Sequence, residues 1–236
     1  MKYTKRIDGR KFDELRPMEA KVGVVKNAAG SAMFKIGKTI AIAAVYGPKD
    51  LFPKFLQNPK KAKLRCSYNM MAFSGSGDRV RPGTSRRSKE IGMVMEKSLE
   101  PAILNLEDYP KAVVDVYVEL IQTDAGTRCA GICAASLALA DAGFEMKDLV
   151  CAVSGGLVGD QVVLDLDKDE EDFGGGAVDI PIAIIPRTGE VTLLQLDGEI
   201  SKDNLKKCIE FAIKGCEQIY KVQQDALRAK YLEETK

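Results

Sequence analysis

Residues 123–128, Thr-Asp-Ala-Gly-Thr-Arg, connect a β-branched, strand-like stretch to an apolar, helix-like stretch with almost no charge. The first N–H groups of a helix have no backbone partners and lie at the positive end of the helix dipole, so they stabilise a bound anion. Gly126 lets the backbone approach a ligand, Thr127 offers a hydroxyl, and Arg128 can donate to two oxygens at once. The spacing therefore predicts a phosphate-binding loop. The alternative is that Asp124 or Thr127 only caps the helix and that Arg128 points into solvent.

A second anion site is predicted at Arg86 and Arg87, which follow a Gly-rich segment and precede a helix expected at about 91–101. Arginines near a helix start oppose the helix dipole, so their placement there is explained by a bound anion such as a phosphate group. The alternative is that both arginines pair with surface carboxylates.

The loop at 49–63 and the strand after it carry basic and aromatic side chains. Lys54, beside Phe52 and Phe55, offers charge and rings that can bind a single nucleic-acid strand, and a solvated surface loop is the alternative. In the strand predicted at 64–71, the alternation of side chains places Arg65 on the face opposite Tyr68.

Carboxylates gather at 165–172, and most of this acidic run is expected to be a solvated turn. Its last member, Asp172, is connected to Asp179 through three consecutive glycines at 174–176, which should bring the two aspartates together. Two carboxylates so placed can hold Mg²⁺, or one of them can have a raised pKa and donate a proton.

Histidine is absent from all 236 residues. Its absence excludes Ser-His-Asp and Cys-His nucleophile systems, histidine-ligated metals and histidine as an acid or base. Any acid–base chemistry must use other side chains or the substrate's own groups. The net charge is only +1, so a nucleic acid would have to be bound by local basic clusters.

The six cysteines form no Cys-x-x-Cys pair, and we interpret them as reduced core residues, with a zinc site from Cys129 and Cys133 as the alternative. The chain has no run of 18 apolar residues and no apolar signal region at its N-terminus. We therefore expect a cytoplasmic protein that does not associate with a membrane.

The periodicity of the chain predicts a mixed α/β protein with one domain, residues 1–236, because no linker divides it. Residues 1–17 are expected to form a charged lead-in arm, and the first three strands an antiparallel meander in which Gly47-Pro48 ends the third strand. Strands are expected at 18–25, 30–36, 39–46, 64–71, 113–121, 148–158, 161–167, 180–185 and 191–196, and further helices at 129–140 and 201–233.

Several segments, taken in order along the chain, resemble the archaeal, exosome-type members of the RNase PH family. The resemblance is carried by residues 6–10, 14–17, 82–90, 122–128 and 194–198, and by Asp172 with Asp179. It implies a two-layer RNase PH-like fold, ribosomal protein S5 domain 2-like, with mixed sheets and a long C-terminal helix. It also implies phosphorolytic 3′-to-5′ exoribonuclease activity that releases nucleoside diphosphates, which we group with the hydrolases.

The resemblance also implies roles for individual residues. Inorganic phosphate, the co-substrate, would be held by Gly126, Thr127 and Arg128. Asp172 and Asp179 would serve protonation and bind Mg²⁺, although six residues separate them here and five do so in the family. The RNA would be held by Arg86, Arg87, Arg65, Tyr68 and Lys54.

The implied partners are the 3′ ends of single-stranded RNA and a homologous inactive subunit, three copies of which alternate with three of this chain in a heterohexameric ring. RNA-binding cap subunits are a further implied partner. The alternatives are a self-assembling RNase PH that trims tRNA 3′ ends, and a non-catalytic RNA-binding ring subunit.

Overall fold

The computed structural model describes residues 3–76, 81, 85–174 and 176–233. Parts of two predicted segments, residues 77–80 and 82–84 of the Gly-rich lead-in and the middle glycine of 174–176, lie outside the described residues.

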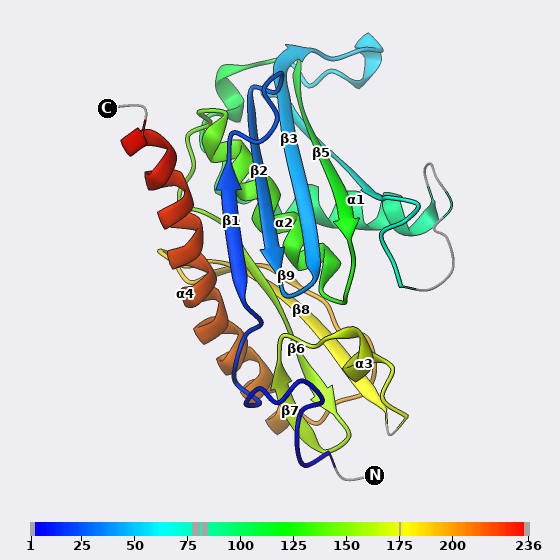
Figure 1. Ribbon diagram of the computed structural model, residues 1–236. Helices are drawn as coiled ribbons and strands as arrows, with labels where there is room; N and C mark the ends of the chain where they lie inside the picture. Colours follow the sequence, from blue (N-terminus) through cyan, green and yellow to red (C-terminus); the bar gives the residue numbers. More distant parts are fainter. Residues whose placement is uncertain (1–2, 77–80, 82–84, 175, 234–236) are drawn as a thin grey trace.

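The chain forms two β-sheets with helices packed against them (Figure 1). The first sheet has the order β1-β2-β3-β5-β4 and is antiparallel except for the parallel pair β4 and β5. Its strands are β1 (Met18–Val22), β2 (Gly30–Ile36), β3 (Thr39–Asp50), β4 (Lys63–Met70) and β5 (Ala112–Gln122). The meander predicted for the first three strands is confirmed.

The second sheet is antiparallel with the order β7-β6-β8-β9. Its strands are β6 (Cys151–Val158), β7 (Gln161–Leu164), β8 (Ala177–Ile185) and β9 (Glu190–Leu194). The helices are α1 (Arg86–Leu99), α2 (Thr127–Asp141), α3 (Lys168–Glu171) and α4 (Lys202–Glu233), with short 3-10 turns at Lys54–Leu56, Glu100–Ala102 and Leu106–Asp108.

Helix α2 is the central element of the core. It is buried along almost its whole length because it packs against β2 and β3 of the first sheet and against β6 of the second. Helix α4 runs beside β1 and along the second sheet (Figure 1). The mixed α/β fold with a long C-terminal helix is thus confirmed.

All six cysteines are free and buried, as predicted. Within the described residues, no group of three or more His, Cys, Asp or Glu side chains could hold a metal ion, so the zinc alternative has no support there. No helix of the described chain has the length and apolarity needed to cross a membrane.

The prediction that Gly47-Pro48 ends the third strand is wrong. Strand β3 continues to Asp50, with a register shift between Tyr46 and Lys49, after which Lys49 pairs with Val113. A bulge of this kind accommodates a proline, which cannot donate to the ladder, together with Gly47, whose φ is 121°.

The prediction of a solvated turn for the acidic run is also wrong. Asp165, Asp167 and Glu170 are buried, and Glu170 has no exposed surface. Arginines of the N-terminal arm explain this burial: the guanidinium of Arg6 donates to both carboxylate oxygens of Glu170 at 2.8 and 2.7 Å, and neither side chain is exposed. Buried carboxylates are stable only when paired and hydrogen-bonded, so this arm makes helix α3 possible.

Candidate active site

The loop before α2 leaves the start of that helix open to a ligand. Ala125 and Gly126 have φ values of 55° and 61°, and Gly126 is the N-cap residue without any side-chain capping bond. Asp124 instead accepts a 3.4 Å hydrogen bond from the backbone N–H of Lys168 and lies 3.6 Å from the guanidinium of Arg16. The interpretation of Asp124 or Thr127 as a mere helix cap is therefore wrong, and the first N–H groups of α2 remain available to an anion.

Thr127 and Arg128 are both fixed by neighbouring side chains. The phenol of Tyr68 donates a 2.9 Å hydrogen bond to Thr127 Oγ1. Arg128 donates to Gln195 Oε1 and lies 4.0 Å from Glu90, with only 22% of its side chain exposed. Arg128 therefore lies against the protein surface and does not extend into solvent.

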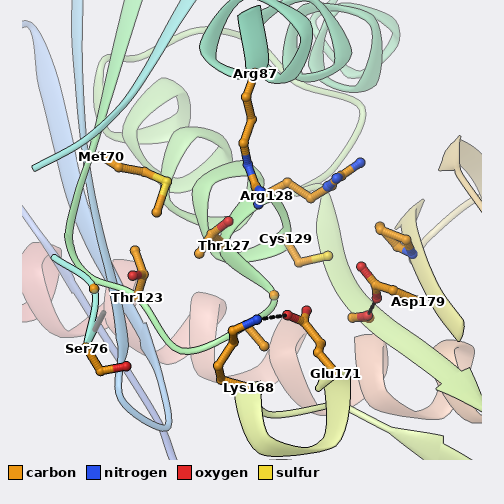
Figure 2. A pocket seen from close by; sticks show the side chains of 15 residues that line it. Met70, Ser76, Arg87, Thr123, Thr127, Arg128, Cys129, Lys168, Glu171 and Asp179 are labelled. Atoms are coloured by element: carbon orange, nitrogen blue, oxygen red, sulfur yellow. Dashed lines mark hydrogen bonds and ion pairs between the residues drawn. The ribbon is translucent and has the colours of Figure 1, made fainter. Parts of the chain in front are cut away.

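Gly126, Thr127 and Arg128 line one hollow (Figure 2). Arg87 reaches it from α1, Lys168 and Glu171 from α3, and Asp179 from β8. Arg87 and Arg128 thus lie near the uncapped helix start, and Lys168 lies beside Glu171, with Asp179 on a neighbouring strand. Such an arrangement suits a reaction in which a phosphate group is bound and a proton is supplied to a nearby oxygen.

Asp179 has the environment of a proton donor. Its carboxylate accepts a hydrogen bond from the hydroxyl of Ser154 on β6. Burial raises the pKa of Asp179 above its ordinary value, and the Ser154 hydrogen bond and the charge of Arg128 oppose that rise only in part. A carboxyl with a raised pKa holds a proton at higher pH than an exposed aspartate does.

Glu171 and Asp172 are adjacent in sequence but differ in environment. Burial, and next the charge of Asp179, raise the pKa of Glu171. The Asp172 side chain is 64% exposed, and its carboxylate lies 2.8 Å from the ammonium of Lys168. Asp172 lines an adjoining hollow together with Arg87, Arg128 and Asp179.

Two family models together match most of the chain. Residues 14–145 match domain 1 of the 3′ exoribonuclease family, RNase PH, and residues 148–215 match its domain 2. The chain belongs to the RNase PH family.

Curated relatives place the chain close to the archaeal part of this family. The protein named exosome complex component Rrp41 from Thermococcus kodakarensis is 51% identical over 228 residues, which are 97% of this chain and 90% of that protein. The protein of the same name from Methanopyrus kandleri is 49% identical over 226 residues, 96% of this chain and 93% of that protein.

Solved structures agree on the fold. Rice Rrp46 superimposes with a TM-score of 0.82 at 27% identity, covering 94% of this chain and 100% of that chain. An Archaeoglobus fulgidus exosome structure with RNA bound to the active site gives a TM-score of 0.76 at 21% identity, covering 96% of this chain and 92% of that chain. The second match supports the shared fold alone.

Family membership corrects one expectation. RNase PH enzymes use inorganic phosphate as a co-substrate, so the acceptor of the nucleotide is phosphate and not water. The grouping of this chain with the hydrolases is therefore wrong.

The structure brings five of the predicted site residues to one hollow, namely Arg87, Gly126, Thr127, Arg128 and Asp179. The remaining predicted RNA contacts lie elsewhere. Arg86 is exposed at the first position of α1, and Lys54 is exposed in the loop beyond β3, at the other end of the sheet from α3 (Figure 1). Arg65 pairs with Asp115 at 2.5 Å, and Tyr68 is buried, each on the face that the alternation predicted.

Sequence reasoning missed Lys168, Glu171 and Ser154. The first two lie in the run interpreted as solvated, and Ser154 lies in a buried strand whose sequence carries no sign of chemistry. Thr39 was missed as well: its hydroxyl donates to the carbonyls of Asp124 and Ala125 at 3.0 and 2.8 Å and so supports the phosphate loop, residues 123–128.

Proposed function

We propose that this chain degrades single-stranded RNA from its 3′ end by phosphorolysis, as the catalytic subunit of an exosome-type ring. The observation that carries the proposal is the uncapped start of α2 beside Arg128 and opposite Asp179, in a chain without histidine. Inorganic phosphate is already an anion and a nucleophile at neutral pH, so this reaction needs positioning, charge stabilisation and a proton donor but no histidine base.

The phosphate loop and the first turn of α2 hold the attacking phosphate. Backbone N–H groups and the hydroxyl of Thr127 donate to its oxygens, and the guanidinium of Arg128 neutralises its charge. Arg87 faces the same hollow from α1 and binds the phosphodiester of the terminal nucleotide, while the exposed Arg86 binds RNA further from the 3′ end.

The chemical step exchanges one P–O bond for another. An oxygen of the bound phosphate forms a bond to the phosphorus of the terminal linkage, and the bond from that phosphorus to the 3′ oxygen breaks. The electron pair of the broken bond goes to the 3′ oxygen, which takes the proton of Asp179. The products are a nucleoside diphosphate and an RNA shorter by one nucleotide, and the same atoms in reverse add a nucleotide.

The carboxylates at the hollow fit Mg²⁺. Mg²⁺ prefers oxygen ligands and is usually held by one or two carboxylates together with substrate phosphates. Asp172 and Asp179 line one hollow and would supply those oxygens together with the substrate phosphates, Asp179 through the carboxyl oxygen that carries no proton. When bound, Mg²⁺ would neutralise charge on the reacting phosphate groups.

The ring would contain three copies of this chain and three of an inactive homologue, with RNA-binding cap subunits. The names of the curated relatives support an exosome over a self-assembling tRNA-trimming enzyme. Arg128 and Asp179 support a catalytic over a purely RNA-binding subunit. We place this ring in the cytoplasm, where thiols such as the six free cysteines stay reduced.

The test uses labelled oligo-RNA and the chain assembled with its ring partner. With phosphate present, we expect shortening from the 3′ end with nucleoside diphosphates as the only released products. Release of monophosphates at an undiminished rate in phosphate-free buffer would contradict phosphorolysis.

A further inference from the structure

Arg16 joins the N-terminal arm to the segment that leads into α3. Its Nε and Nη2 donate to the two carboxylate oxygens of Asp165 at 2.9 and 2.6 Å, and its backbone N–H donates to the same carboxylate at 2.8 Å. The two side chains are 5% and 2% exposed. This is a buried, two-pronged ion pair, the geometry in which an arginine fixes its partner most firmly.

The same guanidinium also touches the phosphate loop. Its Nη1 donates to the carbonyl oxygen of Asp124 and lies 3.6 Å from the carboxylate of that residue. Its Nη2 packs closely against Gly126: a Cβ atom added to this glycine would lie only 3.3 Å from Nη2. Arg16 thus contacts the loop at Asp124 and Gly126 and is not among the residues that line the hollow.

Both ends of this bridge have backbone conformations that need support. Asp165 has a φ of 54°, and Ala125 in the phosphate loop has a φ of 55°. Residues other than glycine rarely adopt this left-handed backbone conformation, and they keep it only where surrounding contacts fix it. Asp165 also lies three residues before Lys168, the first residue of α3, which carries Lys168 and Glu171 into the hollow.

We propose that Arg16 is a positioning residue for phosphate, because its ion pair with Asp165 sets the phosphate loop against α3. The pair also crosses the two family domains, since Arg16 and Asp124 belong to the first and Asp165 to the second. The inference rests on the proposed function, in which the phosphate loop holds the co-substrate. A loop displaced by a fraction of an ångström would hold phosphate out of line while leaving Arg87 and the bound RNA in place.

A neighbouring arginine provides a matched control. Arg10 also reaches Asp165, with its Nη1 3.4 Å from the carboxylate and its Nη2 3.1 Å from the carbonyl oxygen. The hydrogen bonds and ion pairs of Arg10 within the described residues do not include the phosphate loop. Loss of Arg10 therefore weakens the support of Asp165 without removing a contact to the loop.

The experiment compares Arg16→Lys with Arg10→Lys in the full chain assembled with its ring partner. Lysine keeps the charge but lacks the planar guanidinium, whose separate nitrogens reach both oxygens of Asp165 and the carbonyl of Asp124. For Arg16→Lys we expect the KM for phosphate to rise on the order of ten- to hundredfold, as for a misplaced reactant. The KM for RNA should stay within about twofold, and Arg10→Lys should leave the KM for phosphate within the same limit.

Titration calorimetry with inorganic phosphate alone gives a readout that does not depend on turnover, and there Arg16→Lys should bind phosphate more weakly than the parent. Should Arg16→Lys fail to assemble, Thr39→Val replaces it, because it removes another donor to the Asp124 carbonyl and leaves every buried charge in place. The same rise in the KM for phosphate is expected.

Equal effects of the Arg16 and Arg10 variants on the KM for phosphate would overturn the inference. They would show that Arg16 acts only by supporting Asp165, as Arg10 does, and not through its contact with the phosphate loop. An unchanged KM for phosphate in Arg16→Lys, or in Thr39→Val when it stands in, would also overturn it. A parent ring that degrades RNA equally well without phosphate contradicts the proposed function instead, and the calorimetric comparison still tests Arg16.

Discussion

The phenol of Tyr68 donates a 2.9 Å hydrogen bond to Oγ1 of Thr127, joining the buried face of β4 to the first residue of α2. Burial raises the pKa of Tyr68, so the phenol stays protonated and remains the donor. Because Thr127 Oγ1 accepts this bond, its own proton is free to be donated to a phosphate oxygen. Tyr68 is only 4% exposed, which leaves almost no surface for stacking on RNA. In the proposed function, Tyr68 therefore supports phosphate binding.

Tyr68→Phe should therefore impair phosphate use and not RNA binding. The variant removes one neutral hydrogen bond, and the KM for phosphate should rise about two- to tenfold, since such a bond contributes about 0.5–1.5 kcal/mol. Steady-state kinetics at varied phosphate and anisotropy of labelled RNA are the two measurements. A loss of RNA affinity at an unchanged KM for phosphate would restore the RNA-binding role that the family resemblance implied.

The local structure around residues 123–128 was predictable because all its parts are contiguous in the sequence. The strand, the turn with Gly126 and the apolar helix follow one another within some thirty residues, and local patterns suffice to identify them. For the same reason the bounds of β2 match the expected 30–36, and α4 begins one residue after the expected position. The single-domain interpretation stays a prediction.

The burial of Asp165 and Glu170 in the acidic run was not predictable. Arg6 and Glu170 are 164 residues apart, and Arg16 and Asp165 are 149 apart. The sequence contains nearly equal numbers of basic and acidic residues, 35 and 34, but it does not show which of them pair. Unless these pairs are known, the segment around Asp165 and Glu170 has the composition of a solvated turn. The positions of Lys168 and Glu171 in the hollow therefore could not be inferred from the sequence.

Arg128 and Arg87 should separate the two substrates. Arg128→Ala is expected to weaken phosphate use far more than RNA binding, because Arg128 follows the uncapped helix start directly. Arg87→Ala should do the reverse, because Arg87 reaches the hollow from α1 and not from the loop at 123–128 (Figure 2). Each loss of a charge-assisted hydrogen bond should cost about 1.5–3 kcal/mol. Kinetics with each substrate varied in turn measure both effects, and equal effects on the KM for phosphate would argue against this division.

Glu171→Gln and Asp172→Asn form a matched pair of neutral variants on adjacent residues. Both carboxylates pair with Lys168, at 3.8 Å for Glu171 and 2.8 Å for Asp172. Glu171 is partly buried and lines the same hollow as Asp179, whereas the Asp172 side chain is 64% exposed. We expect the Glu171 variant to lose more turnover than the Asp172 variant. Single-turnover rates at saturating phosphate and RNA measure the difference. The opposite order would favour Asp172 as the second carboxylate, as the family resemblance implies, and would show that the additional residue before Asp179 is absorbed in the turn.

Asp179→Asn should abolish most of the chemical step while leaving RNA bound. The change keeps the volume and removes both the charge and the proton donor, so turnover should fall about a hundredfold or more. RNA affinity should stay level or rise, because an anion near the RNA phosphates is lost. Circular dichroism confirms the fold of the variant, and a folded, assembled variant with near-parent turnover would contradict the site.

The raised pKa of Asp179 also fixes the sign of two pH effects. The protonated form is the donor, so turnover of the parent should fall as pH rises through the pKa of Asp179. Ser154→Ala removes a hydrogen bond that lowers this pKa, so the fall in turnover on the alkaline side should move to higher pH in this variant.

The raised pKa of Asp179 also affects folding stability. In the unfolded chain an aspartate has a pKa of about 3.9. A higher pKa in the folded state stabilises the fold at low pH, and this stabilisation is lost as pH rises through the folded-state pKa. We therefore expect the free energy of unfolding of Asp179→Asn, relative to that of the parent, to increase between acid and neutral pH. A decrease over the same range would show that the site stabilises the ionised carboxylate of Asp179.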